Sequence, residues 1–154
     1  MPVVRQPEKA SVKPTHAVAL GILLVASAAG GAWAQDAALI GTARRVAVAS
    51  LDSTQPRLPF EVWLADLGRV PRSSVRWEVN DCGEGGDGRA APTCVEAGLD
   101  LGPDTSAYAT LLVAALDGSP TAPAVWMLFA RTGGTFTEFK GLPEWAAFVR
   151  AHNR

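Results

Sequence analysis

Two segments of the chain alternate strictly between apolar and polar residues. In residues 75–80, VRWEVN, the apolar positions are Val75, Trp77 and Val79, and in residues 93–101, TCVEAGLDL, they are Val95, Ala97, Leu99 and Leu101. A period of two residues is typical of a β-strand that buries one face and exposes the other. The pattern therefore predicts two half-buried strands whose polar side chains share an outer face.

A pair of cysteines links these strands in sequence, with Cys82 after the first strand and Cys94 at the start of the second. If the strands pair antiparallel with the cysteines opposite one another, apolar residues meet apolar residues, and a slip by one position would set them against charged ones. We therefore expect a Cys82–Cys94 disulfide and a register with Val75 opposite Leu101, Trp77 opposite Leu99, Val79 opposite Ala97, Arg76 opposite Asp100, and Asn80 opposite Glu96.

Two other segments have the helical period. Residues 58–68 carry an apolar stripe at i, i+3, i+4 and i+7, formed by Phe60, Trp63, Leu64 and Leu67. Pro59 suits the first turn of that helix, and Gly68 suits its end. The second stripe, in residues 142–152, is formed by Leu142, Trp145, Phe148 and Val149. We expect both stripes to face the core.

The remaining segments complete a meander. Residues 108–116 and 124–130 are nearly continuous apolar runs, which predict central strands covered on both faces. A tight turn at residues 131–135 leads into a short last strand at 136–140, and residues 46–51 indicate either an edge strand or an ordered tail. The predicted fold class is α+β: an antiparallel meander of about five strands, with a helix before it, a helix after it and one disulfide.

The first 34 residues have the organisation of a secretory signal peptide. Arg5, Lys9 and Lys13 precede an uncharged apolar stretch at 17–29, and the small residues Ala32 and Ala34 match a peptidase site. The alternative is a permanent single-span anchor, for which the apolar stretch is at the lower limit of length. We predict cleavage before residue 35, which would give a periplasmic or secreted protein without membrane attachment. The mature chain would then consist of an N-terminal extension at 35–57, either partly flexible or ordered, and a single α+β domain at 58–154.

The charge balance and the predicted compartment indicate which partners the protein binds and whether its cysteines are paired. Residues 35–154 contain 14 acidic and 11 basic residues, a balance that argues against a nucleic-acid-binding surface. Export would place both cysteines in an oxidising compartment, where two thiols in a small domain usually pair.

The stretch 77–88, WEVNDCGEGGDG, has the composition of a candidate site. Its oxygen-bearing residues Asn80, Asp81, Glu84 and Asp87 are the kind of ligands that calcium prefers, but their spacing matches no EF-hand loop. We expect solvated loop acids and no metal. Arg76 and Glu96 complete the candidate binding residues, because the predicted hairpin places them beside this loop.

Catalytic motifs are scarce in this sequence. Of the two histidines, His16 belongs to the predicted signal and His152 lies near the C-terminus, so a Ser–His or Cys–His pair has almost no base. A carboxylate pair drawn from the hairpin acids Glu78, Asp81, Glu84, Glu96 and Asp100 is the alternative. We predict a non-catalytic protein, without a cofactor, that binds another protein or an envelope component. The alternative is a small hydrolase or calcium-binding module that uses residues 80–88.

The string WEVNDCGE at 77–84, followed by TCVEA at 93–97, resembles a group of small secreted proteobacterial proteins. The resemblance covers about residues 58–149 and implies export, with no activity attached to it. The chain is also similar in size and predicted compartment to bacterial periplasmic lysozyme inhibitors, which are small exported β-rich proteins, although it has no inhibitory-loop motif.

Overall fold

The computed structural model describes residues 18–83, 91–115 and 119–153. Chain contacts divide the protein into two units, Met1–Ala34 and Gln35–Arg154. Helix α1, Val18–Arg45, passes through this boundary. Within the described residues, no helix combines the length and the apolar character that crossing a membrane requires. The boundary coincides with the predicted cleavage position, and cleavage itself stays a prediction.

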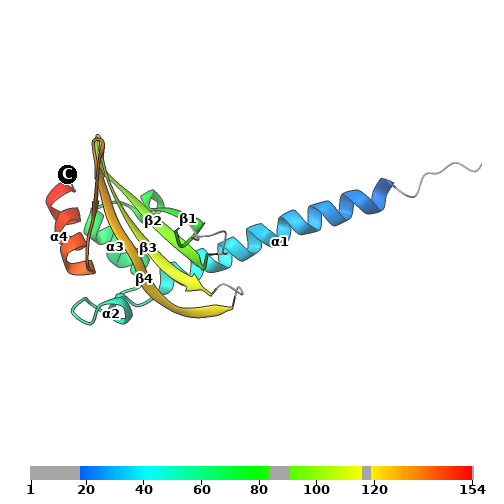
Figure 1. Ribbon diagram of the computed structural model, residues 1–154, viewed down its shortest axis with the longest axis horizontal. Coiled ribbons are helices and arrows are strands. Elements are labelled where there is room, and N and C mark those ends of the chain that lie inside the picture. The colour runs from blue at the N-terminus through cyan, green and yellow to red at the C-terminus, as the bar shows by residue number, and fades with distance from the viewer. Residues whose placement is uncertain (1–17, 84–90, 116–118, 154) are drawn as a thin grey trace, which may run out of the picture. The chain divides into compact units, whose positions relative to one another are not determined.

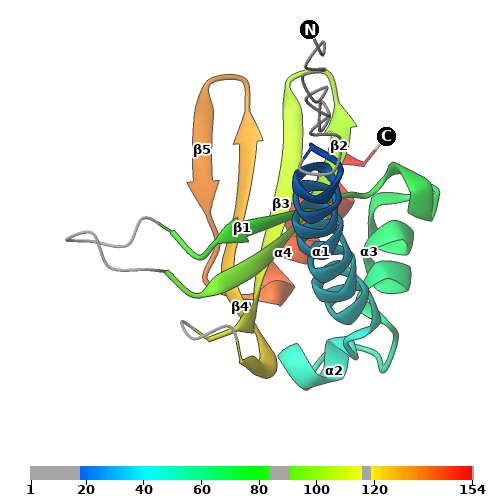
Figure 2. The ribbon, with the colours of Figure 1, turned by 90° about the vertical axis from the view of Figure 1, so that its right-hand side faces the viewer.

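The second unit is built on one antiparallel sheet in the order β1-β2-β3-β4-β5, as the sequence predicts. Its strands are β1 Arg76–Asp81, β2 Thr93–Gly102, β3 Thr105–Ala114, β4 Pro120–Thr132 and β5 Thr135–Glu138. The predicted turn at 131–135 is confirmed, and Gly133 occupies it with a φ of 60°, a left-handed conformation that glycine adopts without a steric penalty. Strand β5 is short and pairs only with the Phe129–Thr132 end of β4 (Figure 2).

The helices of this unit are the C-terminal part of α1, α2 Val48–Leu51, α3 Phe60–Gly68, the 3₁₀ turn η1 Arg72–Ser74, and α4 Leu142–His152. The predicted helices at 58–68 and 142–152 are thus confirmed, so the fold is α+β with helices before and after the sheet. Figure 1 shows α3 and α4 together on one side of the sheet.

Residues 35–57 are an integral part of the second unit. They contain the last turns of α1, and Ala43 and Val48 are completely buried in the core. The edge strand considered for residues 46–51 is wrong, because this segment forms α2 and only Ala47 makes an isolated β-bridge, to Pro59. An ion pair between Arg44 and Glu61 joins α1 to α3.

The end of α3 shows why a glycine lies at position 68. Gly68 is the last helical residue, while Arg69 takes the left-handed conformation with a φ of 53°. A β-carbon on Gly68 would lie 3.3 Å from the Leu99 methyl groups. The predicted end of the helix at Gly68 is thus confirmed, although the left-handed residue is Arg69, and the glycine also allows α3 to approach β2 closely.

The core lies between the helices and one face of the sheet, here called the core face. Its fully buried side chains include Trp145, Phe60, Leu64, Leu99, Leu111 and Leu128. The predicted helical stripes do contribute to this core. The expectation that both strands are covered on two faces is wrong for β4, where Ala124 and Trp126 are exposed. In β3 the consecutive residues Ala109–Leu111 are buried, whereas Ser106 and Tyr108 are only partly buried. The other sheet face, here called the open face, is not covered by any helix in the described part of the chain.

The register of β1 on β2 differs from the predicted one by two positions. The observed pairs are Arg76 with Gly98, Trp77 with Ala97, Glu78 with Glu96, Val79 with Val95, Asn80 with Cys94, and Asp81 with Thr93. The predicted pairs, from Val75 with Leu101 to Asn80 with Glu96, are therefore wrong. A shift of two residues leaves each side chain on its original face, so the alternation of the sequence is equally satisfied by both registers.

The disulfide is compatible with the observed register. Cys82 and Cys94 are bonded, with a Cα–Cα distance of 5.1 Å, so the predicted bond is confirmed. Cys82 lies beyond the last ladder pair, and its backbone N–H donates to the Pro92 carbonyl at 2.8 Å. The bond therefore joins diagonal neighbours and not opposed ones. Arg76 and Asp100 also form their predicted ion pair along a diagonal.

Candidate binding face

An aromatic row crosses the open face of the sheet on three neighbouring strands. The ring centroids of Tyr108 on β3 and Phe129 on β4 are 4.7 Å apart with planes at 15°, and those of Phe129 and Phe136 on β5 are 4.8 Å apart at 29°. Phe136 is 55% exposed. We call Tyr108, Phe129 and Phe136 the aromatic row. Large rings usually contribute to stability by burial, so a stacked row that ends in an exposed phenylalanine is a candidate contact surface.

A glycine on β2 makes room beside this row. Gly98 is opposite Tyr108 on one side and Arg76 on the other. A β-carbon on Gly98 would lie 3.3 Å from the Tyr108 ring and 3.5 Å from Arg76 Nε. The Tyr108 ring and the Arg76 side chain therefore lie over the bare backbone of β2, which brings a cation and an aromatic ring next to one another.

The charged half of the open face lies on β1 and β2. Arg76 Nη2 donates to Asp100 Oδ1 at 3.0 Å, but the two side chains are 58% and 68% exposed, so this pair contributes little to stability. Glu78 and Glu96 are directly opposite one another across the ladder. Like charges at such positions are destabilising. Burial raises the pKa of Glu96 above its ordinary value, and Glu78 raises it further, while Arg76 acts in the opposite direction.

We predict that Glu96→Gln stabilises the protein at neutral pH. The folded chain holds the Glu96 proton more tightly than the unfolded chain, because the pKa is raised in the fold. The contribution of this carboxyl to stability is therefore greatest below its ordinary pKa and is lost as pH rises through the raised value. Urea unfolding should show Glu96→Gln more stable than the native chain by about 0.2–1 kcal/mol at pH ~8, with the difference shrinking towards pH ~4.

Glu144→Gln is the matched control for this prediction, because it makes the same chemical change at an exposed position in the first turn of α4. Negative charge is favourable at a helix N-terminus, so this variant should not gain stability at neutral pH. A Glu96→Gln protein that is less stable than the native chain at pH ~8 would contradict the prediction.

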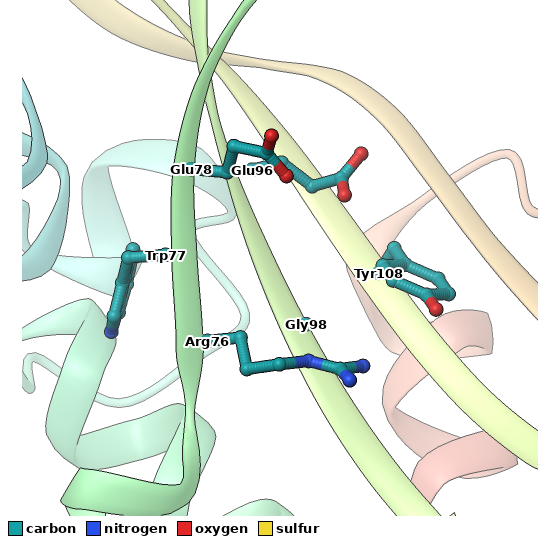
Figure 3. A pocket seen from close by; sticks show the side chains of 6 residues that line it. All are labelled: Arg76, Trp77, Glu78, Glu96, Gly98 and Tyr108. Atoms are coloured by element: carbon teal, nitrogen blue, oxygen red, sulfur yellow. The ribbon is translucent and has the colours of Figure 1, made fainter.

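The charged residues and the aromatic row meet at a shallow hollow of about 520 Å³ lined by Arg76, Trp77, Glu78, Glu96, Gly98 and Tyr108. Figure 3 shows the side chains of Arg76, Glu78, Glu96 and Tyr108 on one side of the strands, with Trp77 pointing away from them. Trp77 in fact packs against the core. The hollow thus offers two carboxylates, a guanidinium and a phenol to a molecule that lies on the open face.

The structure brings together only some of the residues proposed from the sequence. Arg76 and Glu96 line the hollow, and half-buried Asn80 is opposite Cys94 on the same face. Asp81 is exposed at the end of β1. Glu84 and Asp87 lie outside the described residues. Within the described ranges, no group of three His, Cys, Asp or Glu residues is placed to hold a metal ion.

The structure brings together two of the carboxylates considered for acid–base catalysis. Of the five hairpin acids considered, Glu78 and Glu96 are brought together, but Asp100 pairs with Arg76. His152 lies at the end of α4, where its Nδ1 is 2.8 Å from the Phe148 carbonyl oxygen and its ring stacks on Phe148 at 4.0 Å. These contacts give His152 a structural role at the C-terminal end of α4.

The aromatic row was missed in the sequence, although one signal for it exists. Ser106, Tyr108 and Thr110 alternate with Ala107, Ala109 and Leu111, which is the period of a strand with one buried face. The apolar run that begins at Tyr108 conceals this period. The row itself also depends on the registers of β3, β4 and β5, which no single strand pattern specifies.

Comparison with known proteins finds no matching family model, no matching curated protein and no matching solved structure.

Proposed function

We propose that this chain is a non-catalytic binding module, exported to the periplasm or beyond, that recognises a protein or an envelope component through the open face of its sheet. The aromatic row carries this proposal. Tyr108, Phe129 and Phe136 are stacked face to face across three strands, and the row ends in a ring that is 55% exposed. Aromatic side chains of this kind are enriched in the buried centres of protein interfaces.

The form of the hollow supports binding over catalysis. Arg76 and Asp100 are more than half exposed, and Glu78 is exposed as well. Catalytic carboxylates act best in a site that excludes water and holds the substrate on several sides. An open sheet face offers a broad contact area instead, which suits a partner that covers it.

The disulfide supports the exported part of the proposal. A Cys82–Cys94 bond persists in oxidising compartments and is rare in the reducing cytosol. The basic and apolar segments of residues 1–34 have the order of a signal peptide, and the proposed cleavage would release residues 35–154.

A site-specific crosslinking experiment tests the binding face. We expect a photoreactive phenylalanine analogue at position 136 of the full-length protein, expressed in its own host, to yield an adduct of defined mass. The same analogue at Arg150, which is exposed on α4, serves as the control for random collision. Adducts of equal yield from both positions, or none from position 136, would contradict the proposal.

A further inference from the structure

We infer that the partner of the open face is a cationic protein segment, rich in arginine or lysine, that lies across β1 to β5. This inference rests on the proposed function and names the chemistry of its partner. Three features of the face carry it: a pair of directly opposed carboxylates, an aromatic row beside that pair, and an excess of carboxylates over guanidinium groups on the described strands, which disfavours a second copy of the chain.

The first feature is the carboxylate pair Glu78 and Glu96. These residues are directly opposite one another, and the guanidinium of Arg76, which lines the same hollow, donates its hydrogen bond to Asp100. A like-charge pair in this position is unfavourable by itself. A cationic side chain placed between the two carboxylates would offset their repulsion, so binding would be strengthened by the same arrangement that destabilises the free protein.

The second feature is the distance from this pair to the aromatic row. Tyr108 is opposite Gly98, and Glu96 is two residues from Gly98 on the same strand, so Tyr108 and Glu96 are diagonal neighbours. Diagonal residues on adjacent strands are about 7–8 Å apart, within the reach of one arginine side chain. Its planar guanidinium could stack on the Tyr108 ring while it donates to Glu96, a combination that lysine reproduces only in part.

The third feature decides between a cationic partner and self-association. The strands place four carboxylates on the open face, Glu78, Glu96, Asp100 and Glu138, against the guanidinium groups of Arg76 and Arg131. Two copies packed face to face would therefore bring excess negative charge against excess negative charge. Complementary potentials favour association and like potentials oppose it. A basic segment removes this conflict.

The test measures binding of a capped octa-arginine peptide to the full-length protein by calorimetry at low ionic strength. Glu78→Gln/Glu96→Gln should weaken binding about fivefold to tenfold, since two charge pairs are lost. Phe136→Ser should weaken it about threefold through loss of a cation–π contact. The matched control is Asp66→Asn/Glu144→Gln, which removes the same charge from exposed positions on α3 and α4 and should change the affinity by less than about twofold.

Each outcome has a defined meaning. Equal losses in the Glu78/Glu96 and Asp66/Glu144 variants would overturn the inference, because the peptide would then respond only to net charge. Absence of octa-arginine binding, with position 136 still forming its specific crosslink, would overturn the cationic partner and leave the binding face standing. Loss of both would overturn the proposed function as well. The glutamine variants retain the size of the side chain, and a thermal melt verifies that they fold.

Discussion

Trp145→Ala is expected to lower the free energy of unfolding by about 3–5 kcal/mol, the range for truncating a large buried aromatic side chain. Trp145 on α4 is completely buried, and its ring centroid lies 6.3 Å from that of Trp63 on α3. It therefore joins both helices to the core face of the sheet. Urea unfolding followed by circular dichroism measures the loss. A decrease below about 1 kcal/mol would show that the core closes around the vacancy or that α4 does not pack in this way.

The variant Trp145→Phe separates the contribution of the buried ring volume to stability from that of the indole hydrogen bond. The Trp145 indole N–H donates to the Phe129 carbonyl oxygen at 3.1 Å. Phenylalanine keeps most of the ring volume but leaves this carbonyl without its donor, so we expect a loss of about 1–3 kcal/mol, smaller than that of alanine. Because Phe129 also belongs to the aromatic row, this bond fixes the strand that carries the central ring of the open face.

Reduction of the Cys82–Cys94 disulfide is expected to lower the free energy of unfolding by about 3 kcal/mol in the chain-entropy model. The two cysteines are separated by 12 residues, and both are buried. The bond limits the freedom of the unfolded hairpin and holds β1, which among the described strands pairs with β2 alone, to the rest of the sheet. Unfolding of the same native chain with and without reductant measures the effect without changing any side chain.

The double variant Cys82→Ala/Cys94→Ala controls for the reductant itself. Its stability should be independent of reductant and should resemble that of the reduced native chain, less the cost of the small vacancy at Cys94, which is fully buried. Equal stability of the oxidised and reduced native protein would mean that the hairpin is already ordered in the unfolded state or that the bond strains the folded one.

The order and type of the main elements could be predicted because each depends on local periodicity. The stripe of Phe60, Trp63, Leu64 and Leu67 and the alternation around Trp77 are set by neighbours in the sequence. The register could not be predicted in the same way. Alternation has a period of two, so a two-residue slip preserves every face, and a disulfide can join diagonal neighbours as well as opposed ones.

For the candidate site as well, single residues could be predicted from local sequence, but their neighbours on other strands could not. Arg76 and Glu96 were singled out from the sequence, and both line the hollow. Their immediate surroundings were not foreseen, because the corrected register places Glu78 and not Asn80 opposite Glu96. Tyr108, Phe129 and Phe136 come from three strands, and their stacking follows only when the strands are placed side by side.

The shortness of β5 has a consequence for association through the edge of the sheet. Because β5 covers only the Phe129–Thr132 end of β4, the outer backbone edge of β4 lacks a neighbouring strand from Pro120 to Met127 within the described part of the sheet. Such edges recruit strands from other molecules and begin fibrils. Here, Pro120 and Pro123 remove two backbone N–H groups from the strand, and the ladder to β3 is irregular beside Trp126, both of which disfavour the addition of another strand. These features of β4 thus disfavour strand addition at the edge of the sheet, without covering the aromatic row on its open face.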